Sequence, residues 1–344
     1  MEEETARPSA PQKTVAAAPV LDAIMGYQRT AAMLAAIELD LFTMIGSGIA
    51  EPPALAAASG ASQRGIRILC DALCVMSLLA KSEGRYSLSP EAATFLDATS
   101  PAAINDSIQF LAAPEIISMM AGNPAAYVRD GGAEGLASVE ADHPVWVRFA
   151  RGMIPIARPT AKRVAALVGS RSPQPQQVLD VAAGHGLYGI EIARALPNAV
   201  VTAIDWPSVL ELGKANAAAA GVQSRHRALV GDAFGLDWGG GFDLILMGNL
   251  LHIYGRDDCL RLLRKAHNAL TGGGAVWVVE FSPNEDRVSP PIPAMFAFFM
   301  LGITPKGDAY TGREIEEMGR ASGFRRVVSR PLPPTAQTLF SFER

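Results

Sequence analysis

Residues 178–189, near the middle of the chain, combine an apolar strand, a glycine-rich turn and the start of a helix. Gly184, Gly186 and Gly189 follow the pattern GxGxxG, which lets backbone approach a ligand closely at the N-terminus of a helix. This strand, turn and helix restrict the region to an α/β fold with a cofactor site at the turn. The glycines alone do not select the cofactor.

An acidic residue beside the turn narrows the choice of cofactor. Asp180 lies at the end of the strand, where a carboxylate would repel a pyrophosphate but attract an ammonium and a sulfonium. S-adenosylmethionine carries both cations, so the sequence favours this cofactor. A nicotinamide oxidoreductase that uses the same glycine pattern is an alternative, which Asp180 should oppose.

Two further strand ends carry acids that suit a nucleoside. Asp205 ends the expected strand 199–205, 19 residues after Gly186, a spacing that suits the ribose hydroxyls of S-adenosylmethionine and of NAD equally well. The expected strand 229–234 carries Asp232 and Phe234, which could accept a hydrogen bond from an adenine amino group and cover the ring. A surface turn is the other interpretation of residues 229–234.

From residue 178 onward, strand-like and helix-like segments alternate, which predicts a parallel sheet with helices on both faces and the ligand at the carboxyl ends of the strands. Further strands are expected over 242–247 and 275–279, with a helix over 257–270 and a break at residues 272–274. We therefore predict a Rossmann-like, doubly wound α/β catalytic domain over residues 168–344.

The first half of the chain has a different pattern, dominated by helical spacing. Residues 1–16 are rich in Pro and Ala and are expected to form a disordered tail, followed by helices over 22–45, 53–58 and 62–79 and a hairpin over 81–88. Helices followed by a small hairpin predict a winged-helix domain over residues 17–100, and residues 101–167 read as a helical connector. A winged helix can bind DNA, and Arg64 and Arg67 lie on its expected recognition helix, but few other cations accompany them.

Composition limits the possible partners and compartments. The 344 residues suggest about two domains, and 49% hydrophobic residues suffice for sizeable cores. A net charge of -4 and a pI near 5.8 argue against nucleic acid. The acidic start and the short apolar runs indicate neither a signal peptide nor a membrane span, so we expect a cytoplasmic protein. Three cysteines and five scattered histidines predict no disulfide framework and no metal site.

Four segments in order carry a family resemblance: LDVAAGHG at 179–186, IDWPSVL at 204–210, GDAF at 231–234 and NLLH at 249–252. They resemble the S-adenosylmethionine-dependent small-molecule O-methyltransferases that have an N-terminal winged-helix dimerisation domain. The resemblance extends from about residue 17 to the C-terminus, and segments 280–291 and 304–311 resemble a bacterial branch of the family. The cofactor-binding residues that we predict from these patterns are Asp180, Ala182, Gly184, Gly186, Asp205, Trp206, Gly231, Asp232, Ala233, Phe234 and Asn249.

The resemblance implies a reaction and an assembly. It implies transfer of a methyl group from S-adenosylmethionine to a hydroxyl of a small aromatic molecule, as in phenolic or polyketide-like secondary metabolites, with S-adenosylhomocysteine as product. Attack through N, S or C stays open. It also implies a homodimer formed through the N-terminal domain. A relative of this fold that uses S-adenosylmethionine for hydroxylation, decarboxylation or ring closure is the alternative function, and a ligand-responsive DNA binder is a non-enzymatic one.

His252 matches the catalytic base of the family position for position. A phenolic acceptor must lose its proton, histidine titrates in the required range, and general-base assistance typically contributes about 10²- to 10⁴-fold. Family members commonly place an Asp or a second His after the base, whereas this chain has Ile253. Glu280 matches a family carboxylate that flanks the base, and we assign it as the orienting group. A second family carboxylate aligns with Ala309, which leaves only Asp308 nearby.

The acceptor pocket is expected to draw on two segments. Trp146, Phe149 and Met153 fall at i, i+3 and i+7 and share one face of a helix in the connector, which in the family roofs the acceptor site. A second group follows the Pro-rich turn, where flexible Met beside rigid Phe suits a flat apolar molecule. Simple core packing is the alternative for both segments. The predicted substrate-binding residues are Trp146, Phe149, Met153, Met295, Phe296, Phe299 and Met300.

Overall fold

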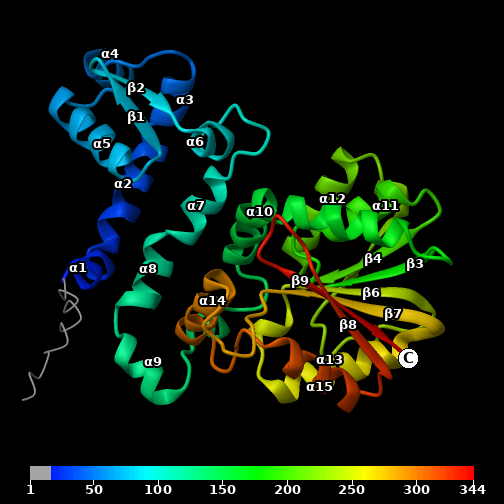
Figure 1. Ribbon diagram of the computed structural model, residues 1–344. Coiled ribbons are helices and arrows are strands. Elements are labelled where there is room, and N and C mark those ends of the chain that lie inside the picture. Colours follow the sequence, from blue (N-terminus) through cyan, green and yellow to red (C-terminus); the bar gives the residue numbers. More distant parts are fainter. Residues whose placement is uncertain (1–16) are drawn as a thin grey trace, which may run out of the picture. The chain divides into compact units, whose positions relative to one another are not determined.

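The computed structural model describes residues 17–344, so the predicted tail of residues 1–16 lies outside the described residues. The chain forms two compact units, the first ending at Asn105 and the second running from Asp106 to Arg344 (Figure 1). From residue 106 onward, the segment that we interpreted as a connector therefore shares one compact unit with the predicted catalytic domain.

The first unit consists of short helices and one hairpin. Its elements are α1 (Ala18–Ile24), α2 (Gly26–Glu38), α3 (Leu41–Gly46), α4 (Pro52–Ser59), α5 (Gln63–Val75), β1 (Leu79–Ser82), β2 (Arg85–Leu88) and α6 (Pro90–Phe95). The two hairpin strands pair antiparallel, and Glu83 and Gly84 between them both have positive φ, as a tight two-residue hairpin turn requires. This is the predicted order of helices followed by a small hairpin.

The prediction of one helix over residues 22–45 is wrong, because the segment forms three helices. The chain breaks at Met25 and again at Leu39 and Asp40, and Asp40 adopts the left-handed conformation with φ of 53°. The apolar spacing continues across both breaks, so periodicity alone did not reveal them. The second break lets Leu41 and Phe42 turn into the core of the unit. The helix predicted over 62–79 also ends earlier, at Val75.

The second unit begins with helices that precede its sheet. These are α7 (Asn105–Leu111), α8 (Pro114–Ala121), α9 (Pro124–Asp130), the short 3₁₀ turn η1 (Gly135–Ser138) and α10 (Pro144–Gly169). The helix α10 has 26 residues and continues through Pro155 and Pro159. Its C-terminal half packs against the sheet domain, because Ala161, Val164 and Val168 belong to the same buried cluster as the first strands.

A seven-stranded sheet forms the centre of the second unit (Figure 1). Its strands are β3 (Gln177–Val181), β4 (Val200–Asp205), β5 (His226–Val230), β6 (Phe242–Gly248), β7 (Leu270–Glu280), β8 (Arg326–Pro331) and β9 (Thr338–Glu343), in the order β5-β4-β3-β6-β7-β9-β8. The first five are parallel, and β9 runs antiparallel to β7 and β8.

Helices cover both faces of this sheet, as the sequence predicted. They are α11 (Leu187–Ala195) and α12 (Pro207–Ala219) beside α10 on one face, and α13 (Arg256–Ala269) and α15 (Gly312–Ala321) on the other (Figure 1). The helix α14 (Pro291–Ile303) packs against α8 and α9. Neighbouring strand residues alternate between two buried clusters; Val178 belongs to the first and Leu179 to the second. The doubly wound α/β fold is confirmed.

The strand order has a switch point between β3 and β6. The chain leaves β3 to form β4 on one side and later returns to form β6 on the other side, so the connections after β3 and β6 diverge. In open α/β sheets, ligands bind at the carboxyl ends of the strands at such a switch point. The predicted cofactor and catalytic motifs all lie at or just after the carboxyl ends of the parallel strands.

Two strand boundaries differ from the predictions. The glycines of residues 272–274, expected as a break, lie within β7, where a register shift against β6 accommodates them as a bulge between Leu270 and Ala275. The strand β5 ends at Val230, so residues 231–234 form a turn rather than the end of a strand. Glycines 272–274 thus form a bulge within β7, whereas Gly231 directly follows the last residue of β5.

Three further features concern the described part of the chain only. Among residues 17–344, no helix combines the length and hydropathy needed to cross a bilayer. Over the same range, no three side chains of His, Cys, Asp or Glu gather in a way that could hold a metal ion. Cys70 and Cys259 are buried free thiols, and Cys74 is half-buried.

Candidate active site

The glycine turn between β3 and α11 has a special backbone conformation. Ala182, Gly184 and Gly186 all have positive φ, at 53°, 56° and 75°. A left-handed Ala is uncommon and is found where a site constrains the backbone. No atom lies within 4 Å of the position that a Cβ on Gly184 would take, so the turn leaves room for a ligand there. Gly189 has a packing role, since its Cβ would stand 2.5 Å from the Val201 side chain.

Asp180 is buried beneath this turn. Its side chain is 2% exposed, and its Oδ2 accepts a hydrogen bond from the Gly189 amide at 3.0 Å. Burial raises the pKa of Asp180 to about 7, and the nearby negative charge of Asp205 adds to the rise. The carboxylate therefore holds the first turn of α11 and gains from any cation placed next to it.

Asp205 fixes the opposite side of the turn. It ends β4, its Oδ2 accepts from the Gly184 amide at 2.8 Å, and its Oδ1 accepts from the Trp206 amide at 2.8 Å. Burial raises the pKa of this carboxyl as well. The two acids come from neighbouring parallel strands and converge on one loop, so the strand ends and the glycine turn form one structure.

A small cleft opens beside these strand ends. Its lining residues are Ala182, Ile204, Asp205, Trp206, Gly231, Asp232, Ala233, Leu250, Tyr254 and Leu262. Six of the predicted cofactor-binding residues are among them. Asp180, Gly184 and Gly186 lie in or directly beneath the adjacent turn. Four lining residues were not predicted, because none belongs to a glycine or acid motif: Ile204, Leu250, Tyr254 and Leu262. Only Tyr254 could have been inferred from the sequence, since it lies two residues after His252.

Phe234 and Asn249 have other partners. The ring of Phe234 packs edge-on against Tyr254 at 5.0 Å, and the Arg261 guanidinium lies 4.8 Å from the centre of the same ring. Asn249 Nδ2 donates to the Tyr188 hydroxyl at 3.3 Å, and its Oδ1 accepts from Gln337 Nε2. The ring that lines the cleft is therefore that of Tyr254 rather than that of Phe234.

The Asn249 side chain belongs to a buried polar chain. Thr160 Oγ1 donates to Gln337 Oε1 at 2.6 Å, and Gln337 continues the chain through Asn249 to Tyr188. Thr160 is fully buried and Gln337 is 6% exposed. These four side chains connect α10, the residue before β9, the end of β6 and the start of α11. These hydrogen bonds thereby fix the end of β6, which precedes His252, relative to α11, which follows the glycine turn.

His252 and Glu280 form a buried pair at the ends of β6 and β7. His252 lies in the 3₁₀ turn η3 (Leu251–Ile253), and its Nδ1 is 2.6 Å from Glu280 Oε2. Glu280 is 2% exposed, and its Oε1 accepts from the Leu251 amide at 2.7 Å. An ionised carboxylate only accepts hydrogen bonds, so in the neutral imidazole Nδ1 carries the proton and Nε2 has the lone pair.

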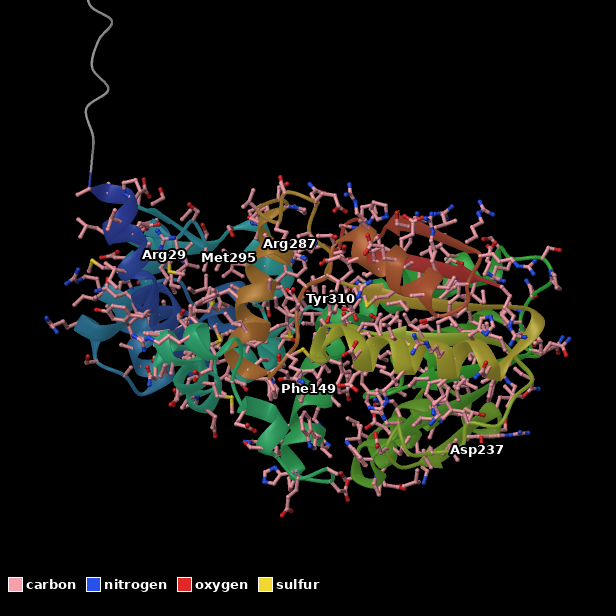
Figure 2. The ribbon with its side chains drawn as sticks, turned by 90° about the horizontal axis from the view of Figure 1, so that it is seen from below. Arg29, Phe149, Asp237, Arg287, Met295 and Tyr310 are labelled. Carbon is pink, nitrogen blue, oxygen red and sulfur yellow. The ribbon has the colours of Figure 1, made fainter. Side chains whose placement is uncertain are left out.

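Aromatic rings from α14 pack beside this imidazole. The Phe296 ring meets the His252 ring at 4.8 Å and 83°, in an edge-to-face arrangement. Phe281 and Phe299 lie 4.7 Å and 6.1 Å from Phe296. Met300, on the same helix, is buried, whereas Met295 is 65% exposed (Figure 2). The structure thus brings Phe296 to His252 and Phe299 beside Phe296.

The predicted residues of α10 occupy the N-terminal half of that helix. Trp146 Nε1 donates to the Glu140 carbonyl at 2.9 Å, and Phe149 packs edge-on against Phe110 of α7 at 5.4 Å (Figure 2). Phe149 remains 38% exposed and Met153 is half-buried.

The position of the second family carboxylate is buried and apolar here. Ala309 is fully buried, and the neighbouring Asp308 carboxylate pairs with Arg287 at 3.5 Å (Figure 2). Burial raises the pKa of Asp308, opposed by the Arg287 charge. The Asp308 amide donates to the His252 carbonyl at 3.0 Å, and a Cβ on Gly307 would lie 2.3 Å from that carbonyl. The backbone of residues 307–308 therefore supports η3, the turn that carries His252.

Comparison with known families decides the identity of this arrangement. The O-methyltransferase domain family matches residues 119–325, and the O-methyltransferase dimerisation domain family matches residues 21–98. The chain belongs to the O-methyltransferase family. It is an S-adenosylmethionine-dependent O-methyltransferase, which confirms the predicted enzyme class and methyl donor.

Similar proteins agree with this assignment over most of their length. The chain is 27% identical to the 3-hydroxy-5-methyl-1-naphthoate 3-O-methyltransferase of Streptomyces sahachiroi over 322 residues, or 89% of each protein. It is 29% identical to the acetylserotonin O-methyltransferase of Mus musculus molossinus over 337 residues, or 92% of this chain and 86% of that one. A candidate O-methyltransferase from Nostoc punctiforme PCC 73102 has a crystal structure that superposes with a TM-score of 0.91 at 40% identity, covering 96% of this chain and 100% of its own.

Among the alternatives, family membership selects methyl transfer over nicotinamide chemistry. It also assigns the helices and hairpin of the first unit to a dimerisation domain rather than to a DNA-binding one.

Proposed function

We propose that this enzyme methylates a hydroxyl group of a small aromatic molecule and that His252 removes the hydroxyl proton. The observation that carries the proposal is the buried His252–Glu280 pair, with Nδ1 and Oε2 2.6 Å apart. A carboxylate that accepts from Nδ1–H fixes the tautomer in which Nε2 can take a proton, and it stabilises the imidazolium that results. Glu280 itself is held by the Leu251 amide and is therefore a positioning residue.

The residues around the glycine turn fit S-adenosylmethionine. We assign the cleft to its adenosine part, with Asp205 accepting from the ribose hydroxyls and the 231–233 backbone facing the base. Asp180 suits the cationic amino-acid end, since a buried carboxylate with a raised pKa gains from a neighbouring positive charge. When bound, the donor supplies an electrophilic methyl carbon on a sulfonium. The open space at Gly184 supports this placement.

The acceptor is proposed to lie against α14. The rings of Phe281, Phe296 and Phe299 form a connected apolar group whose central member touches His252. Flat rings of this kind suit a flat apolar substrate. The two curated relatives are named for a hydroxylated naphthoate and for acetylserotonin, both aromatic. We propose that α7 to α10 close this site from the side of Phe149 and Met153.

We further propose that the enzyme is a homodimer assembled through its first unit. A dimerisation domain matches residues 21–98. Apolar side chains of α1 and α2 are exposed, among them Val20 at 71%, Ile24 at 70% and Tyr27 at 68%. Such a patch on a soluble domain is typical of a surface that a partner covers.

Methyl transfer from isotopically labelled S-adenosylmethionine tests the acceptor class directly. We expect label to enter naphthols and hydroxyindoles and to appear as an ether, and we expect the matching O-methylated compounds to take up none. Label on a ring carbon or on nitrogen would contradict hydroxyl attack. Donor binding without label in any phenolic compound, together with a changed acceptor, would instead support the non-methylating alternative.

A further inference from the structure

A lysine on α13 binds the loop that forms one wall of the cleft. The Lys265 ammonium donates to the carbonyls of Ala233 at 2.8 Å, Phe234 at 3.0 Å and Leu236. An ammonium has three donors, and this one uses all of them on backbone oxygens of a single turn. Three carbonyl dipoles therefore point their negative ends at one cation.

A tryptophan completes the arrangement. The Trp238 ring lies 5.0 Å from the same ammonium and is almost fully buried, at 4% exposed. Its Nε1 donates to the Ala233 carbonyl at 3.0 Å, so that carbonyl accepts from both side chains. Cation–π contact with an indole is the strongest of its kind and adds to the hydrogen bonds.

The loop has little regular structure of its own. It follows β5 as a turn, in which the amides of Gly235 and Leu236 both donate to the Asp232 carbonyl. Convergent carbonyls repel one another when no donor lies between them, so this turn depends on the cation that Lys265 supplies. Asp232 and Ala233, which line the cleft, stand at the start of the same turn.

We propose that Lys265 is a positioning residue for the nucleoside part of the methyl donor. It shapes the 232–236 turn so that the cleft is formed before the ligand arrives. The inference rests on the proposed assignment of the cleft to adenosine. Because Lys265 acts through the loop, its loss weakens binding of every ligand that carries the nucleoside, and it leaves the methyl-transfer step and the acceptor site unchanged.

Calorimetric titration of Lys265→Met tests this role. Met keeps most of the length of the side chain and removes the charged ammonium. We expect Kd for S-adenosylhomocysteine and for 5′-methylthioadenosine to rise by the same factor, about tenfold or more. KM for S-adenosylmethionine should rise in parallel, while kcat at saturating donor and KM for the acceptor stay within about twofold. Equal affinities of the variant and the wild type would overturn the inference.

Arg264→Met is the matched control, since Arg264 is the exposed neighbour on the same helix. It should leave both dissociation constants unchanged. Lys265→Arg should restore part of the affinity because a guanidinium also donates several hydrogen bonds. Suppose instead that Lys265→Met weakens the binding of S-adenosylhomocysteine but not that of 5′-methylthioadenosine. This result would also contradict the proposal, because the effect would then lie at the amino-acid end of the donor.

A second variant guards against misfolding. Trp238→Phe keeps an aromatic ring but removes the donor to Ala233, so it should raise the same dissociation constants by a smaller factor. Thermal unfolding of the ligand-free variants checks that they are folded. If the wild type binds neither ligand, the adenosine assignment fails and takes this inference with it. If the wild type binds both and Lys265→Met and Trp238→Phe bind equally well, only the role of Lys265 fails.

Discussion

At the scale of single residues, Asp180 is a buried acid whose raised pKa predicts effects on stability and on binding. Its pKa is raised to about 7, so between about pH 4 and pH 7 the folded protein keeps a proton that the unfolded chain has released. Stability therefore falls as pH rises through this window. Asp180→Asn should remove this contribution and raise Tm of the ligand-free protein at pH 8 by about 2 °C or more, as thermal unfolding from pH 4 to pH 8 can measure.

The same substitution should weaken the binding of S-adenosylhomocysteine, because an amide cannot neutralise its ammonium. The Asn oxygen can still accept from the Gly189 amide, so the turn itself should persist. Asp130→Asn, at an exposed residue of α9, serves as the control and should change neither property. Stability profiles of the wild type and of Asp180→Asn that run parallel from pH 4 to pH 8 would refute this account of Asp180.

The site residues that could be predicted from sequence are those fixed by strand ends. Asp180, Asp205 and Glu280 each lie at the carboxyl end of one of the parallel strands, so their convergence follows from the fold class. Tyr254 and Lys265 could not be predicted, because their role depends on contacts with a loop about 20 to 30 residues away and no local pattern marks them. Whether Phe234 or Tyr254 faces the cleft is likewise a matter of how one turn is packed.

At the scale of elements, the buried chain from Thr160 to Tyr188 joins two helices to two strand ends. Gln337→Leu would leave the Thr160 hydroxyl without its acceptor and the Asn249 side-chain oxygen without its donor. We expect the free energy of unfolding to fall by about 1–3 kcal/mol, measured by urea denaturation. Gln223→Leu, at an exposed glutamine, should change it by less than about 0.5 kcal/mol.

A double substitution separates the network from general packing. Thr160→Val in the Gln337→Leu background should cost less than it does alone, since the hydroxyl has already lost its acceptor. Strictly additive costs would mean that the two side chains do not interact energetically.

Whole elements were predicted well where their pattern was regular. Alternating apolar segments located β4, β6 and α13 to within a few residues, because burial on a sheet or on one helix face imposes a period. Chain reversals inside an apolar run were not predictable. The left-handed Asp40 depends on which tertiary contacts form, and a continuous apolar pattern is compatible with either outcome. The glycines of residues 272–274 are likewise compatible with a break or with the bulge that β7 forms there.

At the scale of the whole molecule, the exposed apolar residues of α1 and α2 predict self-association. Light scattering at micromolar concentration should give about twice the chain mass of 36.3 kDa. Ile24→Glu combined with Val20→Glu should shift the protein toward monomer, because charges in an apolar interface are costly to bury. Val288→Glu, at an exposed valine of the second unit, should leave the mass unchanged. A wild-type monomer would contradict the dimer.

The central claim is that His252 removes the acceptor proton, and a series of phenols of decreasing pKa tests it most directly. The single-turnover rate of methyl transfer is measured for wild type and His252→Ala at one pH with saturating donor. For weakly acidic phenols we predict a loss of about 10²- to 10⁴-fold, which shrinks toward none for phenols already ionised in solution. A loss below about threefold with weakly acidic phenols, or the same loss across the whole series, would contradict the claim and leave positioning as the source of catalysis.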